Sequence, residues 1–306
     1  MNVLKYSIFV IMGALSYGTL STMIKLGMVD GFTSGELVGS QYMIGWIVIA
    51  AIFLFTFNYR ISLKNVGKLL FTGVITASVG ITYAVSVSEL PASIAVVFFF
   101  QFTWMGVLIE SVLTRTKPSR NKVVAIILLL MGTLLAGAIF EESLSALSIK
   151  GVVFGLLAAL LNAINMVLTS KVATQEKAPK RLFFIGTGAF LTVLLTTPTT
   201  GMVTQLVETN LWKYGLFLGL FGVVIPFLLF AIGMPKIGAG LGTILCAAEL
   251  PSAMIMSVWL LNEGVTPLQW IGMILIVIGI IAPELLNRFT LDYYPMKRWM
   301  SHNRHG

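Results

Sequence analysis

The chain has 306 residues, of which 57% are hydrophobic and only 10% are charged, and its formal net charge is +8. Soluble domains carry about a quarter charged residues, so this chain cannot cover a globular surface with polar groups and is predicted to lie in a lipid bilayer. Its basic residues are spread over many short loops, whereas a nucleic-acid-binding protein gathers them on one face.

A transmembrane helix needs about 20 mostly apolar residues. Turn residues or charges separate the candidates, as in TRTKPSRNK (114–122) and TQEKAPKR (174–181). In chain order the ten candidate spans are 5–27, 34–57, 66–87, 91–113, 122–140, 150–171, 181–201, 211–234, 238–261 and 267–287. The predicted fold class is therefore an all-α integral membrane protein with ten transmembrane helices.

Lysine and arginine in short loops favour the cytoplasmic side of a membrane. With a cytoplasmic N-terminus, 17 of the 20 lysine and arginine residues fall on that side. Six of the 12 acids then cluster on the outer side, namely Asp30, Glu36, Glu141, Glu142, Glu208 and Glu263. The charge pattern predicts a multi-pass protein of the cytoplasmic membrane with both termini in the cytoplasm.

The ten spans divide into five plus five, and the charge pattern of the second half inverts that of the first. Residues 83–136 align with 230–283 at a fixed offset of 147 without a gap, pairing Gly132 with Gly279. An offset of 146 pairs Ser16 with Asn162 and Thr19 with Asn165. The predicted organisation is a first five-helix repeat (1–145), a second, inverted repeat (146–287) and a cytoplasmic tail (288–306).

The ninth span and its flank carry a motif. It reads roughly E-x-P … E-x-x-x-x-x-Q-x-x-G, as Glu249, Pro251, Glu263, Gln269 and Gly272. With the ten-helix duplication, this pattern resembles the drug/metabolite transporter superfamily, EamA type, over residues 5–287. Asn262 stands where that family usually has a glycine before the second acid, and the first half departs more, because Trp104 and Thr116 stand where Pro251 and Glu263 pair. The resemblance implies an inverted-repeat secondary transporter that binds its substrate between the halves at mid-membrane.

Glu249 is the only charge between Ile237 and Leu261 and lies near the bilayer centre. A charge there costs at least about 2.5 kcal/mol on insertion scales, so it must face a cavity, hold a partner or be protonated. Pro251 lacks an N–H and is expected to kink the helix, which leaves the carbonyl of Ala247 without its helical donor. Because desolvation favours a neutral carboxyl group, Glu249 is a candidate to exchange a proton or meet a cationic amine. The alternative is a structural acid that is hydrogen-bonded to a neighbouring helix.

Other polar and aromatic side chains within the spans are further candidates for substrate binding. Asn162 and Asn165 share one face of the sixth span, with Ser16 and Thr19 at the matching places of the first. Gln101 is a mid-span amide beside Trp104, and Tyr17 and Tyr83 could join it around an apolar ligand or a cation over a ring face. Interhelical hydrogen bonds and packing explain the same residues without a binding role.

The sequence favours a transporter over functions of other classes. An intramembrane enzyme would need a nucleophile, base or metal set in the spans, and no HExxH, GxSxG or mid-span histidine occurs. The chain also lacks a nucleotide-binding loop, so transport must draw on an ion or solute gradient. We expect alternating access that exports or exchanges an amino acid, amine or drug-like solute, with protons as one option for the coupling ion. No cofactor or metal is expected, and the protein is a monomer or homodimer. The alternative is a non-transporting membrane scaffold or receptor.

Overall fold

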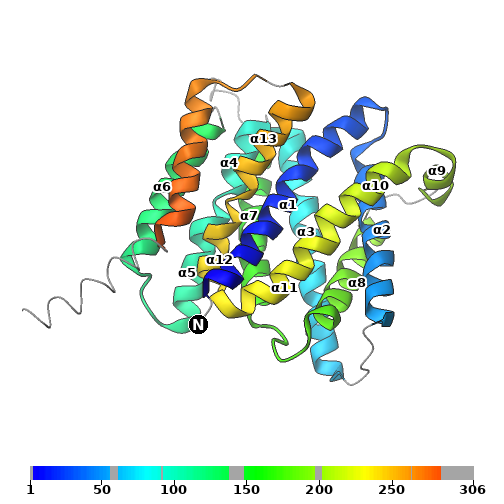
Figure 1. The fold of residues 1–306 in the computed structure, drawn as a ribbon, viewed down its shortest axis with the longest axis horizontal. Helices are drawn as coiled ribbons and strands as arrows, with labels where there is room; N and C mark the ends of the chain where they lie inside the picture. Colours follow the sequence, from blue (N-terminus) through cyan, green and yellow to red (C-terminus); the bar gives the residue numbers. More distant parts are fainter. Residues whose placement is uncertain are drawn as a thin grey trace, which may run out of the picture.

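The computed structural model describes residues 3–55, 61–90, 92–137, 148–196, 202–262 and 264–283, and every regular element in these residues is helical (Figure 1). The elements are α1 (Val3–Val29), α2 (Ser34–Phe55), α3 (Leu63–Glu89), α4 (Ala92–Phe99), α5 (Phe102–Thr114), α6 (Arg120–Ala136), α7 (Ile149–Lys171), α8 (Ala178–Thr196), α9 (Met202–Glu208), α10 (Leu211–Gly219), the π-helical turn η3 (Leu220–Val224), α11 (Ile225–Ile237), α12 (Ala239–Cys246), α13 (Glu249–Leu261) and a last helix, Pro267–Pro283. Glu263 and the tail 288–306 lie outside the described residues.

Eight helical spans in the described residues are long and apolar enough to cross a membrane. Five of them are single helices, and three are composite. The composite spans are Ile94–Thr114, made of α4 and α5; Leu211–Ile237, made of α10, η3 and α11; and Ala239–Leu261, made of α12 and α13. The last helix, Pro267–Pro283, is apolar but shorter. This architecture is that of a multi-pass membrane protein.

The helix boundaries repeat at the offset of 147 that the sequence comparison predicts. α4, α5 and α6 begin and end 147 residues before α12, α13 and the last helix, respectively. The residues that end α5 and α13, Arg115 and Asn262, are also 147 apart, and both adopt a left-handed backbone with φ of 54° and 52°. The duplication therefore extends to backbone conformation.

The N-terminal caps of α6 and the last helix follow the same spacing. Ser119 Oγ accepts from the N–H of Lys122 at 3.3 Å, and Thr266 Oγ1 accepts from the N–H of Gln269 at 3.4 Å. Gln269 returns the bond by accepting from the N–H of Thr266 at 2.9 Å, which completes a capping box. The glutamine of the sequence motif thus stabilises the start of a helix.

α6 and the last helix lie side by side at one edge of the molecule (Figure 1). Gly272 contacts the backbone of Ala136 and Gly132, whereas Gly279, further along the last helix, contacts Leu129. Residues later in the last helix contact residues earlier in α6, so the two equivalent helices run antiparallel. Antiparallel packing of equivalent helices is the geometry of an inverted repeat.

The first helix of each half packs mainly on the other half. α1 lies against α11 and α13, and α7 lies against α3, α4 and α5. Small residues allow this packing in α7, where Gly151 and Gly155 contact side chains of α3 and α4. The largest buried cluster spans both halves for this reason. It joins residues of α1, α7, α11 and α12 to the phenylalanines around the α4–α5 junction.

Candidate functional site

The ninth span is interrupted at its middle. α12 ends at Cys246 and α13 begins at Glu249, and the two residues between them, Ala247 and Ala248, form a turn. Pro251 lies in the first turn of α13, where a missing N–H is tolerated because first-turn donors have no intrahelical acceptor. The kink expected at Pro251 is thus a two-residue break before it, and the carbonyl of Ala247 keeps a donor, the N–H of Leu250 at 3.2 Å.

Glu249 opens α13 where α1 comes closest. A Cβ at Gly18 would collide with the carbonyl oxygen of Glu249 and with the backbone of Ala253, so only glycine permits this approach. Ser252 Oγ donates to the carbonyl of Leu15 at 2.7 Å, which ties α13 to α1. The carboxylate is therefore carried on backbone that two helices, one from each half, hold in place.

The Glu249 side chain is half-buried and has no hydrogen bond or ion pair with any described residue. The hydroxyl groups of Tyr17 on α1 and Tyr83 on α3 lie within electrostatic range of its carboxylate, and so does the thiol of Cys246. A buried polar group is normally satisfied by protein or water. The structural alternative, a glutamate bonded to a neighbouring helix, is not what the described residues show.

Three tyrosines converge on this region. Tyr17 packs against Phe230 with ring centroids 5.8 Å apart, and Tyr83 packs against Phe99 at 4.8 Å. Tyr42 on α2, within electrostatic range of Tyr17, was not among the sequence candidates, since a tyrosine in an apolar span carries no distinguishing pattern. None of the three hydroxyl groups has a hydrogen-bond partner among the described residues. Buried tyrosine hydroxyls usually find one.

The two asparagines of α7 are both 8% exposed but differ in bonding. Asn165 Oδ1 accepts from Thr76 Oγ1 of α3 at 2.8 Å. Asn162 has no hydrogen-bond partner among the described residues. It lies one helical turn before Met166, whose sulfur is 3.9 Å from Cys246 Sγ. Both polar groups of the Asn162 side chain are therefore without a described partner near the break, whereas Asn165 has its oxygen engaged.

Ser16 and Thr19 bond to backbone. Thr19 Oγ1 donates to the carbonyl of Ser16 at 2.8 Å within α1. Ser16 Oγ donates to the carbonyl of Phe221 in η3 at 2.6 Å. In the i→i+5 pattern of a π-helical turn, that carbonyl would accept from residue 226, which is a proline without an N–H. The Ser16 hydroxyl thus satisfies a carbonyl that Pro226 leaves without a donor.

Gln101 and Trp104 bond to each other at the break between α4 and α5. Trp104 Nε1 donates to Gln101 Oε1 at 2.8 Å, and Gln101 Nε2 donates to the carbonyl of Val97 at 3.0 Å. Both polar groups of the Gln101 side chain are therefore hydrogen-bonded at the turn. This turn, at Phe100 and Gln101, interrupts the helical span. A binding role for the pair stays a prediction.

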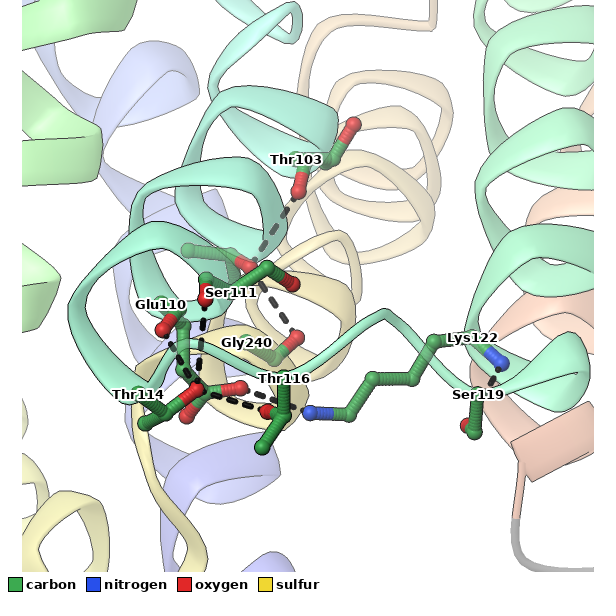
Figure 2. Close-up of polar contacts among 9 residues, drawn as sticks. Thr103, Glu110, Ser111, Thr114, Thr116, Ser119, Lys122 and Gly240 are labelled. Atoms are coloured by element: carbon green, nitrogen blue, oxygen red, sulfur yellow. Dashed lines mark hydrogen bonds and ion pairs between the residues drawn. The ribbon is translucent and has the colours of Figure 1, made fainter.

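At the end of the bundle that holds Glu110 and Lys122, called here the basic end, α5 contacts α12 and is joined to α6 by an ion pair (Figure 2). Figure 2 shows Lys122 Nζ reaching Glu110 Oε2, at 2.6 Å, and the carbonyl of Thr103 accepting a hydrogen bond from α12. That donor is Thr243 Oγ1, at 3.3 Å. A Cβ at Gly240 would collide with the Glu110 carboxylate, and one at Gly106 would collide with Thr243. α5 and α12 are thus in close contact.

The opposite ends of the same two broken spans are not packed in this way. The helices equivalent to α12 and α5, at the offset of 147, are α4 and α13. In the part of the chain that the structure describes, α4 and α13 form no extensive contact, whereas α5 and α12 do. The two broken spans meet at the basic end and separate toward the other end.

Arg181 is a buried charge that sequence reasoning assigned to a cytoplasmic loop. Its side chain is 1% exposed, donates to the carbonyl of Ala231 on α11 at 2.5 Å, and donates to the carbonyl of Thr169 on α7. Its Nε is buried without an acceptor among the described residues. The guanidinium therefore joins three helices near the basic end. No sequence signal separates it from the neighbouring basic residues.

Comparison with known proteins agrees with this architecture. The profile of the EamA-like transporter family matches residues 4–138 and again residues 149–282. The chain belongs to the EamA-like transporter family. It is therefore related to membrane transporters of small solutes, and the double match agrees with a duplicated chain. A protein of known crystal structure shares the fold, with a TM-score of 0.73 and 16% sequence identity over 93% of this chain and 99% of that one. No curated protein sequence matches this EamA-like chain.

Proposed function

We propose that this protein is a secondary active transporter that moves a small organic solute across the cytoplasmic membrane by alternating access, in export or exchange. The observation that carries the proposal is Glu249, a carboxylate without a partner among the described residues, at the central break where α1 and α13 join the two halves. Inverted-repeat transporters bind substrate at the repeat interface beside discontinuous helices. α6 and Pro267–Pro283 would complete ten spans in two inverted repeats, 1–145 and 146–287.

The unequal ends of the broken spans support alternating access. In an inverted repeat, the contact of α5 with α12 has an equivalent in α4 with α13, and among the described residues only the first is extensive. The distribution of lysine and arginine supports a cytoplasmic location for the basic end and for both termini. The protein is then closed toward the cytoplasm, and exchange of the two contacts would close it toward the outside.

A proton is the coupling ion that the site supports best. Tyr17 of α1, Tyr83 of α3 and Cys246 of α12 lie within electrostatic range of Glu249, and no described basic side chain pairs with it. A carboxyl group in that setting has one titratable proton to exchange against a solute. Exchange of the two through a single carboxyl group couples solute movement to a pH gradient.

Replacement of Glu249 by glutamine tests this proposal. We expect Glu249→Gln in proteoliposomes to abolish solute transport driven by a pH gradient, while the melting temperature holds or rises because a neutral amide is less costly to desolvate. The measurement is uptake of labelled phenylalanine, 2-phenylethylamine, adenosine and glucose with and without the gradient. Glu208→Gln, on the exposed helix α9, is the charge-matched control and should behave as the unmodified protein.

Two outcomes would contradict the proposal. Normal pH dependence in Glu249→Gln would make the acid structural. Absence of vectorial movement of every solute by stable, unmodified protein would favour a scaffold or receptor.

A further inference from the structure

The chemistry of the central site narrows the class of substrate. Resting on the proposed transport function, we propose that the site takes an organic cation, an amine or quaternary ammonium group on an apolar or aromatic body, in preference to a zwitterionic amino acid or an anion. Three features of the described residues carry this assignment: a mid-span carboxyl group without a described partner, the lack of a positive group at the same depth, and aromatic rings in the adjoining buried cluster.

The negative charge of Glu249 differs from those of the other described acids. Five of them bond to described residues: Asp30 to Tyr214, Glu36 to Gln205, Glu89 to Lys150, Glu110 to Lys122 and Glu176 to Lys180. Glu208 has no such bond but is exposed on α9. Glu249 alone among them combines partial burial, a mid-span position and no partner. A cationic ligand would supply the opposite charge that an ionised carboxylate needs in a medium of low dielectric constant.

No described side chain offers a positive charge for a ligand carboxylate at this depth. Each described lysine or arginine lies in a loop or within six residues of the end of its span. Arg181, the most buried of them, already donates to the carbonyls of Thr169 and Ala231. A bound amino acid would therefore place its carboxylate near Glu249 without compensation, and like charges in a buried site repel.

The backbone at the break offers little to an anion. A helix N-terminus can bind anions through its free N–H groups. At the start of α13, however, Leu250 donates to the carbonyl of Ala247 and Ser252 donates to that of Ala248 at 3.4 Å. Pro251 has no N–H to give. The donors that would recognise a carboxylate are thus largely occupied.

Aromatic rings surround the residues that flank Glu249. Cys246, Ala247 and Ala248 belong to the main buried cluster, and Leu250 packs against it. The rings in or against that cluster are Tyr17, Tyr83, Phe99, Phe100, Phe102 and Phe230. Ring faces attract cations that have left water, and they accept an apolar ligand body. A carboxylate with such neighbours suits a lipophilic cation.

A matched ligand series tests the assignment. 2-Phenylethylamine, phenylalanine and 2-phenylethanol share one apolar body and differ in charge. We expect the purified protein in nanodiscs to bind the amine at least about tenfold more tightly than the other two, measured by calorimetry. Glu249→Gln should remove this preference, and Glu208→Gln should keep it.

A second pair of variants separates the ring from the hydroxyl group. Tyr83→Leu, which removes the ring, should weaken amine binding several-fold more than Tyr83→Phe, which keeps it, and should affect 2-phenylethanol binding less. Equal or tighter binding of phenylalanine, absence of amine binding, or an amine preference retained in Glu249→Gln would each overturn the assignment. If vectorial, Glu249-dependent transport of another solute persists, only the substrate class fails. If no solute moves, the proposed function fails as well.

Discussion

The two broken spans show what duplication preserves and what it leaves free to change. Both breaks are two residues long and lie 147 residues apart, at Phe100–Gln101 and Ala247–Ala248. Only the second is followed by a proline; Trp104 stands in the place of Pro251. The break is therefore a property of the repeated fold rather than of Pro251. In the first half, Gln101 and Trp104 satisfy the turn with side-chain hydrogen bonds.

The chemistry at equivalent positions differs more than the backbone. Phe102, the counterpart of Glu249, is fully buried in the aromatic cluster. One half thus supplies packing at the position where the other supplies a carboxylate. A transport site of this kind can be asymmetric although the helices around it are nearly symmetric.

The largest expected effect comes from cross-linking equivalent contacts, in a Cys246→Ala background. The pair Thr103→Cys and Thr243→Cys lies where α5 contacts α12, and its equivalent between α13 and α4 is Leu250→Cys with Val96→Cys. We expect oxidation to link the first pair in the resting protein and to stop transport until reductant is added. The second pair should link only while a transported solute drives turnover. Equal cross-linking of both pairs in the resting protein would contradict the difference between the α5–α12 and α4–α13 contacts.

The next largest effect concerns Phe102 and its counterpart Glu249, of which the first is a packing residue and the second is proposed to act in transport. Phe102→Ala should lower the free energy of unfolding by about 3–5 kcal/mol, because it empties a fully buried site. Glu249→Gln should leave the melting temperature unchanged or raised while transport is lost. Thermal unfolding in detergent compares the two variants. Similar losses of stability in both would mean that Glu249 is a packing residue like its counterpart.

A smaller loss of stability should follow Gly18→Ala. The added Cβ meets backbone of Glu249 and Ala253, which cannot move cheaply, so overpacking should cost about 1–3 kcal/mol and reduce transport. Gly80→Ala is the matched control on α3, where a Cβ meets nothing within 4 Å. It should be neutral or slightly stabilising. A stable and active Gly18→Ala would show that α1 is not held against α13.

The smallest effect should come from Pro251→Ala. The break persists without proline in the first half, and the carbonyl of Ala247 already accepts from Leu250. We expect a loss of about 0.4–1 kcal/mol, from the greater freedom of the unfolded chain, with transport largely kept. A continuous helix through Ala247, detected by amide hydrogen exchange, would assign the break to the proline after all.

Much of the fold could be predicted from local patterns. Apolar length locates the spans, and an offset of 147 locates three pairs of helices to the residue, because a repeat conserves element lengths when side chains change. The interruption of α4 and α5 could not be predicted. Phe100 and Gln101 are ordinary helix residues, and tertiary packing rather than propensity decides the turn.

The site was predicted only in part, for a related reason. An acid in an apolar span is costly wherever it lies, so Glu249 stands out in the sequence itself. Whether Asn162 or Asn165 has a partner depends on Thr76, which is 89 residues from Asn165. Likewise, Arg181 differs from a loop arginine only through carbonyls on two other helices. Such contacts are non-local, and no spacing rule in one sequence reports them.

α1 and α7 each pack on the opposite half of the chain, so neither half alone contains all the surfaces that its helices need. A lone five-helix unit would leave its first helix without the surface on which it packs, and would expose small-residue faces such as that of Gly18 to lipid. The same contacts form if a second copy enters the membrane in the opposite orientation. Two such units in opposite orientations would bury these faces against each other, and joining them in one chain allows one half to carry an acid, Glu249, where the other carries a phenylalanine, Phe102.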